Sequence, residues 1–262
     1  MKLAALYTIY NGTELLKGSI EQIARYCDEI IICYQNHSNT GNVSRESDNW
    51  IKENKEFLRK IGAKILYFYP DLNKNTKQNE RDKHNCMLET ARKQGCTHFF
   101  LSACDHYYDQ TEFEKAKMYV SENNIDVSLT YMYTFYKQTN WRLEPIESYC
   151  MPFICKIHPD TTICQNPNYP ILTDPSVQVA PAKNFHIFSQ DEIMLYHFSM
   201  IRLNIDSKFD NAAASIRWTK EQIETFKSEY KTAKLGSKIS YFQGREIVEM
   251  NHRFTNLTKS DQ

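Results

Sequence analysis

Residues Asn79 to Asp109 read NERDKHNCMLETARKQGCTHFFLSACDHYYD, and this stretch decides the predicted fold. Its first half has helical spacing, because one face collects His84, Met87, Leu88 and Ala91. Gly95 follows two basic residues, which is the usual composition of a helix C-terminus. Phe99–Ala103 is then an apolar run of the length of a buried strand. A helix, a glycine stop and a buried strand form half of an α/β unit.

The strand is followed at once by a polar cluster that begins with Asp105 and ends with Asp109. In open α/β sheets, ligands bind outside the carboxyl ends of the strands. Asp105 therefore occupies a position where a site is expected. An equally weighted alternative is that Asp105 only caps the next predicted helix, Thr111–Ser121.

The residues before this stretch alternate between predicted strands and helices. Strands are predicted at Leu3–Tyr10, Asp28–Tyr34 and Lys64–Tyr69, and helices at Glu14–Tyr26 and Asp48–Ile61. Four alternations with short connections predict an α/β fold with a mainly parallel sheet covered by helices. Polar loops after Tyr10, Tyr34 and Ala103 would then meet at one rim of the sheet.

The alternation fades after Ser121. Apolar segments follow at Ile125–Phe135, Tyr149–Ile157 and Ile193–Arg202, of which the second is predicted as a strand, and Pro159–Ala182 is predicted as a loop. Two helices are expected at Ile205–Ala214 and Thr219–Ala233, and a frayed end from Asn256.

Composition excludes several classes of protein. The net charge is +0, which argues against a protein that holds nucleic acid mainly by bulk charge. Only 7 glycines occur and none forms a phosphate loop, so Walker-type and dinucleotide sites are not expected. The 8 cysteines contain no Cys-x-x-Cys pair and are expected to be free buried thiols. We find neither a bilayer-spanning run nor a signal peptide, so a cytoplasmic location is expected.

Three blocks resemble the large inverting family of GT-A glycosyltransferases that includes small bacterial and phage enzymes. The first is Thr8–Leu16 (TIYNGTELL), followed by Cys27–Ile32 (CDEIII), with Ser38–Gly41 in place of the family's Ser-x-Asp-Gly loop. The second is the helix and strand that lead to Asp105. The third is Leu195–Arg202 (LYHFSMIR), which resembles the late block whose histidine completes the metal site. The likeness covers roughly Lys2 to Tyr108 and this late block.

The resemblance implies a GT-A fold and transfer of a sugar from a UDP- or GDP-type donor, with Mn²⁺ or Mg²⁺. A divalent cation offsets the charge on a leaving diphosphate, and carboxylates and imidazoles suit Mn²⁺. The implied metal ligands are Asp105, His197 and His106. The implied donor contacts are Thr8, Tyr10, Glu14, Gln35, Arg81, Lys83 and Arg202. The predicted domain is one compact catalytic unit, with a nucleotide-sugar-binding half at 1–125 and an acceptor-side half with C-terminal helices at 126–262.

The chain departs from the family pattern at two places. The family's Asp-x-Asp is Ala103-Cys104-Asp105 here, and the acidic residue that usually ends the second strand is replaced by Cys33, Tyr34 or Gln35. An inverting enzyme also needs a carboxylate to take the acceptor proton. Asp174 and Asp109 are the candidates for this base, although an aspartate before proline is more often a turn residue.

Two other functions remain open from the sequence. One is a sugar-phosphate nucleotidyltransferase, although the Gly-rich basic loop of that class is missing after the first strand. The other is a catalytically degenerate GT-A protein that binds carbohydrate or nucleic acid. The acceptor of a transferase would be a glycan or, in a phage, a hydroxymethylated DNA base, against which the neutral charge weighs mildly.

Overall fold

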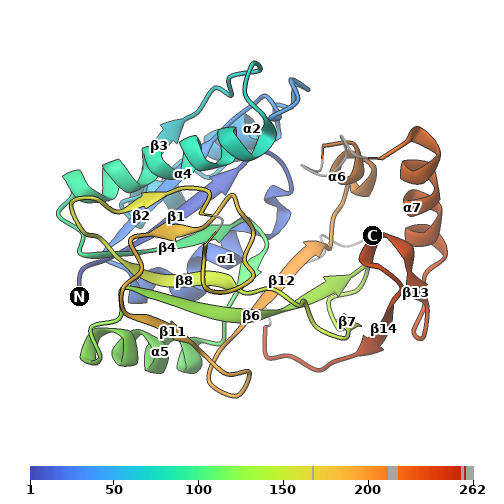
Figure 1. Cartoon of the computed structure of the whole chain (residues 1–262). Coiled ribbons are helices and arrows are strands. Elements are labelled where there is room, and N and C mark those ends of the chain that lie inside the picture. Colours follow the sequence, from blue (N-terminus) through green and yellow to red (C-terminus); the bar gives the residue numbers. More distant parts are fainter. Residues whose placement is uncertain (167, 212–217, 255–256, 258–262) are drawn as a thin grey trace.

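The computed structural model describes residues 1–166, 168–211, 218–254 and 257. Its main sheet has 12 strands in the described residues (Figure 1). The main path runs in the order β13 (Lys238–Ile239), β14 (Arg245–Glu249), β7 (Trp141–Glu144), β6 (Val127–Tyr136), β8 (Met151–Lys156), β4 (His98–Ala103), β1 (Leu3–Ile9), β2 (Glu29–Tyr34) and β3 (Lys64–Tyr67). The predicted α/β fold with a parallel core sheet is confirmed, because β4, β1, β2 and β3 are parallel neighbours.

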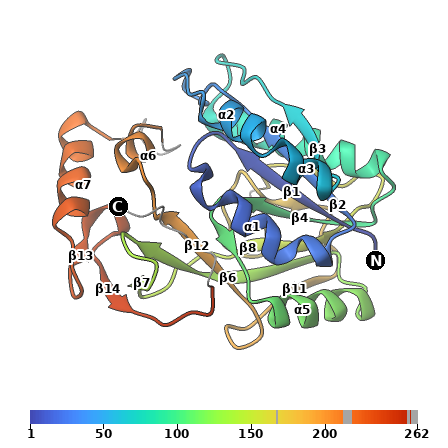
Figure 2. The same ribbon diagram turned by 180° about the vertical axis from the view of Figure 1, so that it is seen from behind.

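Helices cover both faces of this parallel core. The α-helices of the described residues are α1 (Leu16–Ile23), α2 (Glu46–Glu53), α3 (Lys55–Lys60), α4 (Thr76–Lys93), α5 (Gln110–Glu122), α6 (Ile205–Asn211) and α7 (Lys220–Thr232), of which α6 and α7 pack with the C-terminal strands instead. Figure 1 shows α4 in front of the sheet, and Figure 2 shows α1 and α5 on the opposite face. Alternate residues of β1 enter two separate cores: Leu3, Ala5 and Tyr7 pack with α1 and α5, whereas Ala4 and Leu6 pack with α4.

The helix boundaries differ from the predicted ones for local reasons. Helix α4 begins at Thr76, three residues before the predicted helical stretch that starts at Asn79, because Asn75 and Gln78 form a capping box. The predicted helix Asp48–Ile61 is two helices, α2 and α3, which meet at Asn54. Asp109, and not Asp105, caps α5, since its side chain accepts from the backbone N–H groups of Thr111 and Glu112. The capping alternative for Asp105 is therefore wrong.

The later residues extend the sheet on the far side of β4. Strand β8 lies between β4 and β6, and the long strand β6 also pairs with β12 (Met194–Met200) and β7. The predicted loop Pro159–Ala182 contains two short strands, β9 (Thr162–Ile163) and β10 (Val179–Ala180). Residues 212–214 of the predicted helix and most of the predicted frayed end lie outside the described residues.

A short pairing brings the late block to Asp105. Strand β5 (His106–Tyr107) runs antiparallel to β12, and His106 stands opposite His197 in the register. The third off-path strand, β11 (Phe185–Ile187), pairs with the start of β6. Among the described helices we find none that combines the length and apolar character needed to cross a membrane.

Candidate functional site

Asp105 lies in the turn between β4 and β5, at the carboxyl end of a parallel strand. Its carboxylate is almost fully buried, and its backbone carbonyl accepts a hydrogen bond from the N–H of Phe198 at 2.9 Å. This bond ties the turn to β12, the strand that carries His197. The site is therefore fixed by strand pairing on both sides of Asp105.

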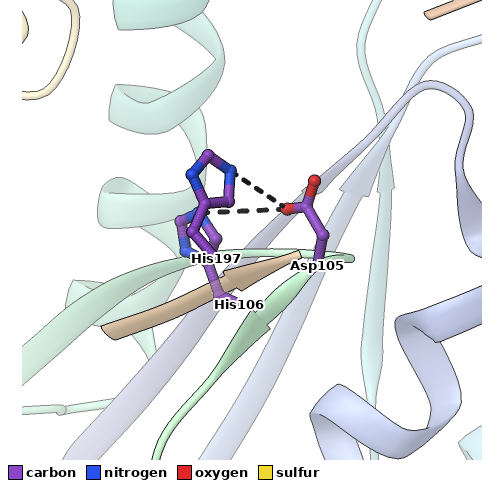
Figure 3. A group of neighbouring side chains, drawn as sticks. All are labelled: Asp105, His106 and His197. Atoms are coloured by element: carbon purple, nitrogen blue, oxygen red, sulfur yellow. Dashed lines mark ion pairs between the residues drawn. The ribbon is translucent and has the colours of Figure 1, made fainter. Parts of the chain in front are cut away.

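Two imidazoles face one oxygen of this carboxylate (Figure 3). Asp105 Oδ1 lies 3.9 Å from Nε2 of His106 and 3.8 Å from Nε2 of His197. Desolvation lowers the pKa of His106 and lowers that of His197 to about 3, so both rings are neutral at pH 7. Neutral imidazoles offer their ring nitrogens as ligands.

Arg202 holds the other oxygen of the same carboxylate. Its Nη2 donates to Asp105 Oδ2, and its side chain is 4% exposed. Burial alone would raise the pKa of Asp105, but Arg202 opposes it and the net shift is downward, so Asp105 is a carboxylate. Nε and Nη1 of Arg202 are buried and find no hydrogen-bond partner among the described residues.

Gly12 makes room for this guanidinium. Its φ is +73°, and a Cβ placed on it would lie 2.6 Å from Cζ of Arg202. A side chain at position 12 would therefore both strain the backbone and displace Arg202. The glycine after β1 is thus part of the site.

Asp105, His106 and His197 form a group that could hold a metal ion. The ligand atoms of Asp105, His106 and His197 all lie within 4.8 Å of one another. Two ligands of one Mg²⁺ ion lie at most about 4.2 Å apart, and the two Asp105–histidine distances are below that limit. A carboxylate with two imidazoles also suits Mn²⁺. Of the three, His106 gave the weakest signal in the sequence, and the β5–β12 pairing puts it beside His197.

A cleft of about 250 Å³ opens beside this cluster, and we call it the Asp105 cleft. Five of the predicted donor contacts line it: Thr8, Tyr10, Gln35, Lys83 and Arg202. Glu14 and Arg81 are not among its lining residues. Glu14 instead accepts a hydrogen bond from the backbone N–H of Leu203, whereas Nη1 of Arg81 is buried without a partner among the described residues.

A buried polar network forms the wall of the Asp105 cleft at the end of β2. Nζ of Lys83 donates to Gln35 and Glu80, at 3.0 Å in each case. Asn39 also donates to Glu80, and Gln35 donates to the carbonyl of His37. The resembled family usually has an acid at the end of the second strand. This chain has the amide of Gln35 there, and the amide oxygen accepts a hydrogen bond from Lys83. Glu80 and Asn39 could be found only from the structure, because they are far apart in the sequence and the fold brings them into contact.

Helix α6 forms another wall and brings Lys208, a residue that the sequence pattern does not single out. Asn11 donates to Ser207 at 3.1 Å, and Asn42 donates to Asn211 at 3.0 Å. Lys208 lines the Asp105 cleft, and its pKa is lowered first by burial and then by Arg202. The only sequence signal for Lys208 was its proximity to Arg202 in the chain.

The two predicted catalytic aspartates are not among the residues that line the Asp105 cleft. Asp109 caps α5. Asp174 accepts hydrogen bonds from the backbone and hydroxyl of Ser176 and pairs with Lys77 at 3.2 Å. Lys77 belongs to the first turn of α4, next to Thr76, which does line the cleft.

No protein-family model matches the chain, and no curated protein sequence matches it. Structural similarity extends over most of the chain to S. aureus TarS, a GT-A glycosyltransferase of family 2. The structure of TarS 1-349 gives a TM-score of 0.47 at 13% identity, over 88% of this chain and 71% of that one. The complex of TarS 1-349 with UDP-GlcNAc gives a TM-score of 0.47 at 12% identity, over 89% of this chain and 74% of that one. A further structure of TarS gives a TM-score of 0.42 at 10% identity, over 88% of this chain and 43% of that one.

Proposed function

We propose that this chain is a metal-assisted, inverting glycosyltransferase that takes a sugar from a nucleotide-sugar donor and transfers it to a hydroxyl group. The observation that carries the proposal is the cluster at the rim of the parallel sheet. There a buried carboxylate meets two neutral imidazoles on one oxygen and a guanidinium on the other. Such a cluster suits an anion and a cation bound side by side, as a sugar diphosphate with its metal would be.

Asp105, His106 and His197 would hold the cation, which supplies charge compensation for the leaving diphosphate. Arg202 and Lys208 supply fixed positive charge to the same anion. Two buried N–H groups of Arg202 have no protein partner among the described residues, and phosphate oxygens that reached them would satisfy both. The nucleoside would then lie toward Thr8, Tyr10 and the network around Gln35.

For the acceptor proton we propose Asp174 in preference to Asp109. Asp109 caps the N-terminus of α5, a helix that contributes no lining residue to the Asp105 cleft. Asp174 stands beside the start of α4, whose residues Thr76, Glu80 and Lys83 line the Asp105 cleft. Burial raises the pKa of Asp174, but the hydrogen bonds from Ser176 together with Lys77 outweigh it and hold the pKa below its usual range, so Asp174 is ionised and able to accept a proton.

Thermal unfolding with nucleotide ligands tests the proposal. We expect UDP, GDP or one of their sugar conjugates to stabilise the protein, and to do so more strongly with Mn²⁺. A ligand at a hundredfold excess over its Kd adds about 2.7 kcal/mol. UDP-GlcNAc, the ligand of one TarS structure, is the first donor to use.

Asp105→Asn is the matched variant, and Asp109→Asn is its control, since asparagine also caps helices well. We expect Asp105→Asn alone to lose the Mn²⁺-dependent part of the stabilisation. Release of free sugar from the stabilising donor without acceptor distinguishes an enzyme from a binding protein. The proposal fails if none of the nucleotides stabilises the protein, or if Asp105→Asn responds to Mn²⁺ like the wild type.

A further inference from the structure

A second and larger cleft, of about 620 Å³, adjoins the Asp105 cleft. It is walled by α1, α2 and α6, and we call it the α1–α6 cleft. The two clefts share Asn11, Arg202 and Lys208 as lining residues. Arg202 and Lys208 therefore stand at the junction of two spaces, and not at the end of one.

The volumes show that the Asp105 cleft is too small for a whole donor. Pockets for ligands of drug size span about 300–1,000 Å³, and the Asp105 cleft has about 250 Å³. A nucleoside diphosphate fills such a space by itself. The sugar that it carries, or the sugar that receives the transfer, needs further room, and the adjoining cleft supplies it.

The charges that line the α1–α6 cleft balance. Its carboxylates are Glu14, Glu21 and Glu46, and its cations are Lys17, Arg202 and Lys208. Two of the carboxylates already accept backbone N–H groups: Glu46 that of Thr13 and Glu14 that of Leu203. A cleft without net charge does not attract a phosphate backbone, because binding of that kind depends on a surplus of lysine and arginine.

The remaining lining suits a neutral ligand with many hydroxyl groups. Asn11 and Asn54 supply amides, and Lys17 and Glu21, which pair at 4.0 Å, supply a donor and an acceptor. Trp50 lines the cleft as well, with most of its side chain in the core. Hydroxyl groups donate to carboxylates and accept from amides and ammonium groups. A tryptophan combines apolar surface with a polar edge, which is the character that a sugar ring matches.

A second observation points to a ligand at the junction. Arg202 is 4% exposed, and two of its nitrogens have no hydrogen-bond partner among the described residues. Buried donors of this kind cost stability unless something satisfies them. Since Arg202 lines both clefts, a ligand that passes from one cleft to the other would contact the Arg202 side chain.

We propose that the α1–α6 cleft binds a saccharide, either the sugar moiety of the donor or the sugar unit of the acceptor. The proposal rests on the proposed transferase function and deepens it, because it names a sugar and not DNA as the class of ligand beside the reaction centre. Glu21 is the residue that tests it. Glu21 is exposed on α1, lines the α1–α6 cleft and is absent from the lining of the Asp105 cleft.

The test compares Glu21→Trp, which narrows the cleft, with Glu53→Trp, another exposed helical position that lines neither cleft. Calorimetry with Mn²⁺ measures Kd for UDP and UDP-GlcNAc, or for the GDP pair if that is the pair that stabilises the wild type. Transfer from the same donor to a panel of p-nitrophenyl glycosides is measured beside donor hydrolysis. Saturation-transfer NMR with the same glycosides reports saccharide binding without any nucleotide.

If the donor sugar occupies the cleft, Glu21→Trp weakens the nucleotide sugar about tenfold and leaves the nucleoside diphosphate unchanged. If an acceptor sugar occupies it, both Kd values and hydrolysis stay unchanged, whereas transfer and the NMR signal fall about tenfold. The proposal is overturned if Glu21→Trp matches Glu53→Trp throughout, or if it weakens the diphosphate and the nucleotide sugar equally. A different result would contradict only the proposed transferase function. In that case the wild type binds glycosides but no nucleotide, and Glu21→Trp abolishes the glycoside binding.

Discussion

Replacing Gly12 by alanine tests whether the position of the Arg202 guanidinium controls the site. The added Cβ would lie 2.6 Å from Cζ and 2.8 Å from Nε and Nη1 of Arg202. Carbon atoms in contact prefer about 3.5–4.0 Å, so the guanidinium has to move by about 1 Å. Its Nη2 is hydrogen-bonded to Asp105, and the bond would stretch by a similar amount.

The cost separates into two parts. A non-glycine residue at φ +73° costs about 1–2 kcal/mol in backbone strain. Loss of a hydrogen bond between charged groups costs about 1.5–3 kcal/mol more. Gly62→Ala is the matched control, because Gly62 has φ +65° and nothing lies within 4 Å of the Cβ it would carry. That variant should lose the backbone part alone.

Urea unfolding and nucleotide binding measure the two parts. We expect Gly12→Ala to lose about 2 kcal/mol more stability than Gly62→Ala. We also expect it to bind the stabilising nucleoside diphosphate at least about tenfold more weakly, because a displaced Arg202 no longer meets the phosphate. Gly62→Ala should bind like the wild type. Equal stability and equal Kd in the two variants would refute the reasoning about Arg202.

Three further predictions concern the surroundings of the site. Lys83→Met should lower the free energy of unfolding by about 2 kcal/mol, because it leaves Glu80 without its ammonium partner. Unchanged stability in urea unfolding would contradict this. Asp109→Ala should cost about 1 kcal/mol through the lost cap yet keep full transferase turnover, and a loss of turnover in the folded variant would instead make Asp109 catalytic. Burial lowers the pKa of His84 to about 4, so stability is complete above pH 6.5 and is lost as the pH falls toward 4, by about 2 kcal/mol between pH 7 and pH 5. In His84→Gln that part of the pH dependence should vanish from unfolding curves.

The parallel half of the fold could be predicted because its signals are local. Apolar runs such as Phe99–Ala103 and the stop at Gly95 mark elements without knowledge of their neighbours. The position of Asp105 followed from the general rule for strand ends in α/β sheets. Where local capping decides, as at Asn75, the prediction missed the helix start because a capping box is weaker than the polar composition around it.

The rest of the site depends on partners that are distant in the chain. His106 meets His197 only through the pairing of a two-residue strand, and two-residue strands have no periodicity to detect. Lys208 reaches the cleft through hydrogen bonds between α6 and the loops after β1 and β2. The roles of all the predicted catalytic, donor-binding and metal-binding residues stay predictions.

The long strand β6 has a consequence for how the chain reaches this structure. It pairs with β8 and β11 at one end and with β12 and β7 at the other. Many paired strands are far apart in the sequence. In the neighbouring pair of β14 and β7, for example, Ile247 stands opposite Leu143. Such pairings make folding slow, because long loops must close before the contacts form. Until β8 pairs with β4, the edge of β4 is exposed during synthesis of the chain. Strands of other chains can form hydrogen bonds with such an edge.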